Sequence, residues 1–257
     1  MNDAIWQRLH AVPAHLGAVY LDLNSQHCWS WNAWDDLPAA SVIKVPIMVG
    51  ILSLCQQGSL GLEQRLKVAA SDHVSGAGVL HELHDGLEVT IEDLCRLMIV
   101  VSDNVASNLL LERLGDPAAW LERWKLSETV LGRRFMEPPS PQRDNRTSAW
   151  DMARFLRELY HGELLDESYT RLALDIMRRQ QYREKIPLML PPDLGVAHKT
   201  GELDGVRHDI GIVEVPQHPY VLVLLSEKGA SPWDVDRALA ELSLEVYRWH
   251  LKRLRLN

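Results

Sequence analysis

A serine and a lysine three residues apart, Ser41 and Lys44 (SVIK), open the most apolar stretch of the sequence. Residues at this spacing share a helix face, so the Lys44 amine is expected beside the Ser41 hydroxyl. A serine hydroxyl is a weak nucleophile, and a neighbouring base such as a neutral lysine can activate it. A helix-capping serine followed one turn later by a solvated lysine would give the same pattern. The pair alone therefore leaves both interpretations open.

Two further short motifs lie where predicted elements begin or end. Ser102 to Asn104 (SDN) stands just before a helical pattern, at a place where these residue types are also preferred caps. Lys199 to Gly201 (KTG) follows at the end of a predicted strand, where glycine is also typical of a turn. Each motif is weak by itself, but the three together and in this order are much more specific.

SxxK, SDN and KTG in this order are the signature of class A β-lactamases and penicillin-binding proteins. The sequence resembles that superfamily over nearly its whole length, and the similarity extends to Ser75 to Leu80 (SGAGVL), Asn145 to Ala153 and His198 to Gly211. It is more similar to the broad class A-like serine hydrolase branch than to the well-known resistance enzymes.

The resemblance implies catalytic roles for four residues. Ser41 would be the acylated nucleophile, and Lys44 would accept its proton during acylation. Ser102 would pass the proton to the leaving nitrogen. Lys199 would supply positive charge that tunes Ser102 and attracts a substrate carboxylate. Two lysines in one cleft also depress each other's pKa, which helps keep Lys44 a base.

The resemblance also implies substrate-binding roles. Asn104 would hold the amide side chain of the substrate, while Thr200, followed by Gly201, would bind its carboxylate. The backbone N–H groups of Ser41 and Glu202 would form the oxyanion hole. Two fixed donors of this kind stabilise developing negative charge by several kcal/mol, roughly, in a dry site.

The segment from Arg133 to Arg146 departs from the family pattern. Class A enzymes carry their deacylating glutamate in an E-x-x-L-N pattern on this loop. Here Glu137 is followed by proline, no Leu-Asn comes after it, and the loop is shorter. Glu137 is the candidate deacylating base, and the plainer interpretation is a solvated loop glutamate.

Four other residues could complete the loop and its chemistry. Arg133 and Asp144 are expected to close the base of the loop as an ion pair, worth at most about 1 kcal/mol if exposed. Asn145 and Glu202 are further candidates for holding the deacylating water, and the residue pattern favours neither.

Beyond KTG, Arg207 is the expected additional anchor for a substrate carboxylate, because guanidinium binds carboxylates in a bidentate fork. His208 is the second candidate, and simple packing is the alternative for both. Pro46 lies in the first turns of the helix that Ser41 opens, and it removes one hydrogen bond. An irregular first turn that exposes Ser41 is therefore expected.

Hydrophobic patterning predicts the elements that must position these motifs. Strands are expected at 16–23, 26–31, 195–199, 206–215 and 220–226, and helices at 41–57, 90–101, 103–114, 147–160, 166–179 and 232–256. Strands from both ends must then form one body. The predicted fold class is α+β: an α/β lobe with an antiparallel sheet flanked by helices, plus an all-helical lobe. The resemblance implies a β-lactamase/transpeptidase-like fold.

The predicted domain organisation is one integrated catalytic unit. Residues 1–40 and 190–257 would build the α/β lobe, and residues 41–189 the all-helical lobe. The active-site cleft would lie between the lobes, where the three motifs meet.

Composition excludes several other classes. The chain has 257 residues and a net charge of −8, which argues against a nucleic-acid binder. Its longest apolar stretch, Val45 to Cys55, is too short to span a membrane. Cys28, Cys55 and Cys95 are expected to be buried, reduced thiols, and no spacing suggests a metal site. No secretory signal is visible, so a cytoplasmic location is expected, or a periplasmic or secreted one if a leader was removed.

The leading hypothesis is a serine hydrolase that acts through an acyl-enzyme at Ser41 and hydrolyses β-lactams, in the setting of antibiotic resistance. One alternative is a carboxypeptidase or esterase acting on peptide or acyl substrates. Another is a penicillin-binding or sensing module that is acylated and turns over poorly. In each case the expected partner is a carboxylate-bearing small molecule, no cofactor is required, and the oligomeric state is left open.

Overall fold

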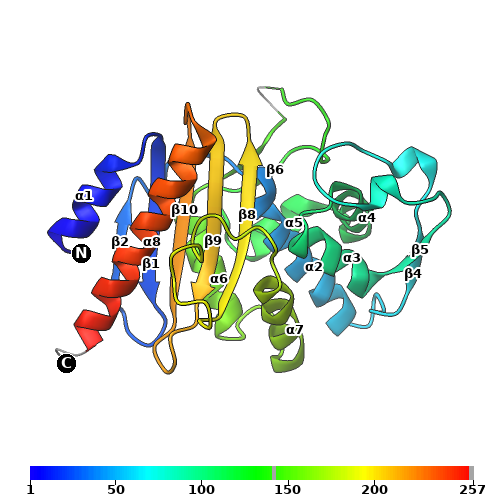
Figure 1. Ribbon diagram of the computed structural model, residues 1–257. Helices are drawn as coiled ribbons and strands as arrows, with labels where there is room; N and C mark the ends of the chain where they lie inside the picture. The colour runs from blue at the N-terminus through cyan, green and yellow to red at the C-terminus, as the bar shows by residue number, and fades with distance from the viewer. Residues whose placement is uncertain (141–142, 255–257) are drawn as a thin grey trace.

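A five-stranded sheet joins segments from the two ends of the chain (Figure 1). The computed structural model describes residues 1–140 and 143–254. The sheet has the order β2-β1-β10-β9-β8, built from β1 (His15–Asp22), β2 (Cys28–Trp31), β8 (Val196–Leu203), β9 (Val206–Val213) and β10 (Tyr220–Glu227). All neighbouring strands are antiparallel. The α+β class with an antiparallel sheet, predicted from the sequence, is confirmed.

Strand β8 lies at the edge of this sheet, since β9 is its one neighbour in the strand order. The strand extends to Leu203, so KTG lies inside it and not at its end, as the sequence pattern had suggested. The two-residue turn to β9 contains Gly205 at φ +68°, a conformation that glycine adopts without strain. The motif is therefore presented along a regular edge strand.

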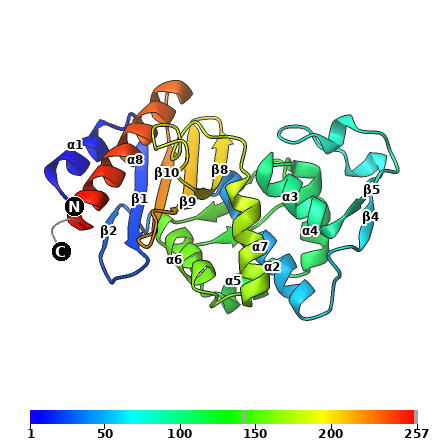
Figure 2. The same cartoon turned by 60° about the horizontal axis from the view of Figure 1, so that its bottom comes forward.

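Alternation along the strands divides the apolar residues between two cores. Ala18 and Tyr20 pack in a core with residues of α1 (Asp3–Ala11) and α8 (Pro232–Leu254), whereas Val19 belongs to the core on the other face. Helices α1 and α8 lie side by side over their face of the sheet (Figure 1). Helix α6 (Ala149–Tyr160) packs on β1 and β10 from the other side (Figure 2).

The remaining helices surround the segment that carries Ser41 and Lys44. Helix α2 (Lys44–Gln56) is buried on nearly all sides, as its continuous apolar pattern predicts. It packs against α4 (Asn104–Leu114), α7 (Glu167–Arg178) and α3 (Ile91–Val100), while α5 (Pro117–Arg123) follows α4. Helix α7 also contacts β8, so the helices and the edge strand meet beside the motif residues.

Short elements complete the architecture and brace the loop from Arg133 to Arg146. Strands β3 (Leu37–Pro38), β7 (Asn145–Thr147) and β6 (Val130–Leu131) form a small sheet in the order β3-β7-β6. This sheet joins both ends of the loop to the segment just before Ser41. A second pair, β4 (Arg65–Lys67) with β5 (Glu88–Thr90), and the 3-10 turns η1 (Ala40–Ile43), η2 (Ala70–Asp72) and η3 (Leu80–Glu82) make up the rest.

One cysteine prediction is wrong. Cys55 and Cys95 are buried and free, as expected, but Cys28 is exposed, because it begins the edge strand β2 with its side chain directed outward. Two short helices, α1 and α5, also lay outside the sequence prediction. Helix α1 buries only Ile5 and Leu9, and α5 only Leu121, so their apolar periodicity is weak. None of the helices in the described residues is long and apolar enough to cross a membrane.

Candidate active site

Ser41 lies in the 3-10 turn η1, which runs directly into α2 at Lys44. Residues i and i+3 eclipse in a 3-10 helix, so the turn stacks Lys44 over Ser41. Ala40, just before the serine, has φ +43°, a conformation that non-glycine residues rarely adopt. The irregular first turn expected from Pro46 is confirmed. Pro46 is the third residue of α2, where its missing N–H costs no regular helical bond.

The Lys44 amine is completely buried at the centre of the motif residues. Its Nζ donates to the Ser102 carbonyl oxygen at 2.7 Å and to Asn104 Oδ1 at 2.8 Å, and it lies 3.1 Å from Ser102 Oγ. Burial, assisted by the nearby charge of Lys199, holds the pKa of Lys44 well below its usual range. A neutral amine can donate the first two bonds and accept a proton from the Ser102 hydroxyl. The arrangement suits a base.

Ser102 stands between two lysines. Its Oγ lies 3.1 Å from Lys44 Nζ and 3.1 Å from Lys199 Nζ, so the hydroxyl can accept a proton from one amine and pass one to the other. Burial lowers the pKa of Lys199 to about 7. The backbone of Ser102 has φ +57°, a sparsely populated region for serine that often marks functional positions.

The capping interpretation of SDN applies to Asp103 and not to Ser102. Asp103 caps α4 by accepting from Ala106 N–H at 2.9 Å. Its second oxygen accepts from the backbone N–H groups of Val79, at 2.6 Å, and Leu80, at 2.9 Å. A Cβ on Gly78 would lie 2.3 Å from that oxygen, which explains the glycine. Asp103 therefore ties the SGAGVL segment to the start of α4, a role that the sequence analysis did not identify.

Asn104 positions Lys44. Its Oδ1 accepts from the lysine, and its Nδ2 donates to the Ser75 carbonyl oxygen at 3.1 Å. Both ends of the amide thus have partners within the protein. The implied role of Asn104 toward a substrate amide stays a prediction.

Gly201 allows strand β8 to approach the turn that carries the nucleophile. A Cβ at Gly201 would lie 3.1 Å from Ser41 N and 3.1 Å from Ala40 Cβ, closer than nearly all real Cβ contacts. The glycine is therefore favoured by close packing inside a strand and not by a turn. Thr200, beside it, is buried, and its implied contact with a substrate carboxylate stays a prediction.

Arg207 does not point a free guanidinium at the motif residues. Its Nε donates to Asp236 Oδ1 at 2.8 Å, its Nη2 contacts the other Asp236 oxygen, and its Nη1 lies 3.0 Å from Glu202 Oε2. The bidentate fork expected for a substrate is thus occupied by a carboxylate of the protein. The sequence carried no sign of this partner, which lies 29 residues further along the chain.

Glu202 and His208 also have partners within the protein. The Glu202 carboxylate accepts from the fully buried Lys185 at 2.7 Å as well as pairing with Arg207, so it is not placed as a free base. His208 is buried, with Nε2 2.7 Å from the Pro38 carbonyl oxygen. Burial lowers its pKa to about 4, so it is neutral near pH 7 and does not supply a positive charge for a carboxylate.

The ion pair expected at the base of the loop is present, with Arg133 Nε 2.8 Å from Asp144 Oδ1. Asn145 is buried and accepts from the N–H groups of Gly132, at 3.0 Å, and Arg133, at 3.1 Å. Its side chain braces the loop, and its implied role toward the deacylating water stays a prediction. Glu137 is exposed, and its Oε2 accepts from Arg134 N–H at 3.2 Å, within the loop itself.

Phe135, and not Glu137, is the loop residue that reaches Lys44. The Lys44 amine lies 4.6 Å from the centroid of the Phe135 ring, within the range of a cation–π contact when the amine is charged. Asn108 holds the phenylalanine backbone at both groups, accepting from its N–H at 2.9 Å and donating to its carbonyl oxygen at 3.1 Å. The sequence analysis identified a role for neither residue, because Phe135 is an apolar loop residue without a catalytic pattern and the contact of Asn108 with it depends on the fold.

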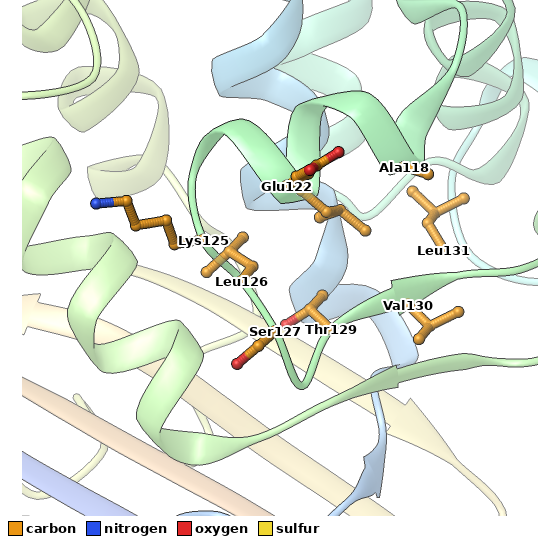
Figure 3. A pocket seen from close by; sticks show the side chains of 9 residues that line it. Ala118, Glu122, Lys125, Leu126, Ser127, Thr129, Val130 and Leu131 are labelled. Atoms are coloured by element: carbon orange, nitrogen blue, oxygen red, sulfur yellow. The ribbon is translucent and has the colours of Figure 1, made fainter.

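A pocket of about 400 Å³ lies away from these residues, between α5 and β6 (Figure 3). Its lining is largely apolar and includes Leu126, Val130 and Leu131, with no member of the three motifs. The chemistry of the site is therefore carried by the seam between η1, α4 and β8, and not by this pocket. Within the described residues, no group of three or more His, Cys, Asp or Glu side chains is arranged to hold a metal ion.

Comparison with known proteins gives a consistent picture. A β-lactamase from Mycobacterium tuberculosis is 30% identical over 240 residues, which cover 87% of this chain and 76% of the relative. A β-lactamase structure from Sphaerobacter thermophilus matches with a TM-score of 0.90 at 26% identity, over 96% of each chain. A leucine-to-glutamate variant of PBP-A, in an acyl-enzyme complex with penicillin G, matches with a TM-score of 0.88 at 27% identity, over 97% of each chain.

The family model described as the β-lactamase enzyme family matches residues 2–250. This span includes all three motifs and every strand of the five-stranded sheet. The chain belongs to the β-lactamase enzyme family.

Proposed function

We propose that the protein is a serine hydrolase that opens β-lactam rings through an acyl-enzyme at Ser41. The observation that carries the proposal is the Ser102 hydroxyl, which lies 3.1 Å from each of two buried lysine amines, beside the turn that holds Ser41. Membership of the β-lactamase family and the similarity to named β-lactamases support the same reaction.

The acylation step uses these residues in sequence. The neutral Lys44 amine takes the Ser41 proton as the serine oxygen bonds to the lactam carbonyl carbon. The carbon–nitrogen bond of the ring then breaks, and the nitrogen takes a proton from Ser102, which is resupplied from Lys44. The low pKa of Lys44 supports this role, because a base must be unprotonated before it acts. The backbone N–H groups of Ser41 and Glu202 are the proposed oxyanion donors.

The proposed substrate carries a carboxylate that binds beside Lys199 and Thr200. Arg207 is paired with Asp236, so we assign this task to Lys199, the lysine of the KTG motif itself. A bound carboxylate would favour the charged form of this lysine, since an opposite charge raises the pKa of an amine. The contacts of the described residues add nothing that favours the carboxypeptidase or esterase alternative.

Intact-protein mass spectrometry after mixing with penicillin G tests the proposal. The expected result is one covalent adduct of penicillin mass per chain, located on the peptide that contains Ser41. Ser41→Ala should form none, whereas Ser59→Ala, which removes an exposed serine in the bend after α2, should label like the parent protein. An adduct on the Ser41→Ala protein would refute the assignment of the nucleophile.

A further inference from the structure

We infer that Gln180 and Tyr182 are positioning residues for acylation, because they hold Ser102 in the left-handed conformation that places its hydroxyl between the two lysines. The inference rests on the proposed acyl-enzyme and concerns how the proton donor of its first step is placed. Neither residue belongs to the three motifs. Both lie just after α7, and each bonds a carbonyl group 81 residues earlier in the chain.

Ser102 depends on its surroundings for its backbone conformation. Its φ of +57° lies in the left-handed region, where a residue with a Cβ is strained and persists only when surrounding contacts fix it. The residue comes two positions after Val100, the last residue of α3. A change to another backbone region would redirect the Ser102 side chain, and Oγ would leave its place 3.1 Å from each lysine amine.

Gln180 holds the end of α3 with its side chain. Its Nε2 donates to the Ile99 carbonyl oxygen at 2.8 Å, and its Oε1 accepts from the Tyr182 N–H at 3.0 Å. The backbone N–H of Gln181 donates to the Val100 carbonyl oxygen at 3.1 Å. The last carbonyl groups of a helix have no partner within it, so these bonds satisfy two of them. Gln180 is only 2% exposed, so its amide bonds are sheltered from water.

The two peptide groups that flank Ser102 are each held by a side chain. The Val101 carbonyl oxygen, on the N-terminal side, accepts from the Tyr182 hydroxyl at 3.3 Å. The Ser102 carbonyl oxygen, on the other side, accepts from Lys44 Nζ at 2.7 Å. A rotation about φ or ψ of Ser102 turns one of these peptide groups relative to the other. The two side chains together therefore fix the conformation of Ser102.

The segment that carries Gln180 and Tyr182 is anchored at its other end as well. The Ile186 N–H donates to the buried Asp209 carboxylate of β9 at 2.9 Å, and the Ile186 carbonyl oxygen accepts from the Ser243 hydroxyl of α8 at 2.8 Å. The segment thus ties the end of α3 to the sheet that carries KTG.

The placement of Ser102 matters for one step of the reaction. The ring nitrogen must receive a proton as its bond to the carbonyl carbon breaks, and a placed general acid speeds such a step by about 100-fold to 10,000-fold. A misplacement of about 1 Å can cost about 100-fold. Loosening Ser102 should therefore slow bond breaking and leave the binding of the β-lactam nearly unchanged.

Rapid-quench mass spectrometry of adduct formation, over a range of penicillin G concentrations, tests the inference, because it gives the limiting rate and the half-saturating concentration separately. Gln180→Ala should lower the limiting rate by about 10-fold or more and change the half-saturating concentration by less than about 3-fold. Tyr182→Phe removes one hydroxyl and should lower the limiting rate by about 3-fold.

Gln56→Ala is the matched control. It removes a glutamine at the end of α2 whose Oε1 accepts from the Asp166 N–H at 2.8 Å, and it should change neither quantity.

Gln180→Glu adds a readout that a merely structural role would not move. A protonated carboxyl group has the shape of the amide and can donate to Ile99 while accepting from Tyr182, whereas the ionised group cannot donate. Burial raises the pKa of a carboxyl group, so the protonated form gains population as the pH falls from about 8 to about 5.5. The limiting rate of this variant, divided by that of the parent protein, should rise over this range. A ratio that stays constant or falls would contradict the inference.

The outcomes separate the two claims. Failure of the parent protein to form any adduct would overturn the proposed function and the inference with it. A folded Gln180→Ala protein that keeps the parent's limiting rate would leave the proposed function standing and overturn the inference alone. An equal fall in the Gln56→Ala protein would do the same. Tyr182→Phe decides if the Gln180 variants fail to fold, because its ring is kept and the residue is 36% exposed.

Discussion

Replacing Asp103 by alanine should cause a large loss of stability, for reasons that can be counted in the structure. The substitution removes the cap of α4, which is worth about 1 kcal/mol. It also leaves the buried N–H of Leu80 without its acceptor, at about 1–3 kcal/mol, and that of Val79, which costs less because Val79 is exposed. The cap and the buried Leu80 N–H together give about 2–4 kcal/mol, a large share of the roughly 5–15 kcal/mol that typically stabilises a folded protein.

Chemical denaturation provides the assay, with Asp116→Ala as the matched control. Asp116 caps α5 in the same way, through Ala118 N–H at 3.0 Å, but it is exposed and holds no second segment. We expect about 1 kcal/mol or less for the control variant. An Asp103→Ala protein that loses no more stability than the Asp116 variant would refute the argument that Asp103 ties two segments together.

The same substitution should also affect activity. Asp103 holds the segment that contains Ser75, and the Ser75 carbonyl oxygen accepts from Asn104, which in turn positions Lys44. Release of this segment should slow acylation by penicillin G even where the protein remains folded. Unchanged acylation in the folded variant would show that Lys44 is positioned without this chain of contacts.

Three further predictions concern the strand side of the site. Gly201→Ala places a methyl group against Ser41 N and should slow acylation by at least about 10-fold, as measured by adduct formation with a melting curve as control. The second-order rate of acylation by penicillin G should fall as the pH rises through about 7, because Lys199 then loses the charge that attracts the carboxylate. Lys199→Arg should remove this fall from the rate–pH profile, because arginine stays charged at these pH values. Arg207→Ala should lower the melting temperature by removing the guanidinium that bonds to both oxygens of Asp236, while changing KM for penicillin G less than about 3-fold.

The sequence was sufficient for the parts of the site that depend on local spacing. Ser41 and Lys44 lie one turn apart where η1 runs into α2, as their spacing predicts. The antiparallel sheet follows from alternating patterns at both ends of the chain. The ion pair between Arg133 and Asp144 could also be anticipated, because the two residues flank one loop.

The features of the site that the sequence did not predict depend on contacts between segments far apart in the sequence. Phe135 could not be identified from the sequence, because nothing in the pattern of an apolar loop residue indicates that the fold places it beside Lys44. The pairing of Arg207 with Asp236 could not be predicted, because it depends on how α8 packs against β9. Glycine in KTG was explained by a turn because the approach of Ser41 to the strand has no local signal.

The pairing of β1 with β10 has a consequence for how the protein is made. Val19 lies opposite Val223, so the first strand to leave the ribosome has its main partner among the last. During synthesis the edge of β1 that pairs with β10 stays unpaired until the helical segments between them have been made. Native contacts of this kind slow folding, since distant segments must find each other. A nascent chain that pauses before β9 and β10 would expose this edge, and an unpaired strand edge can pair with other chains.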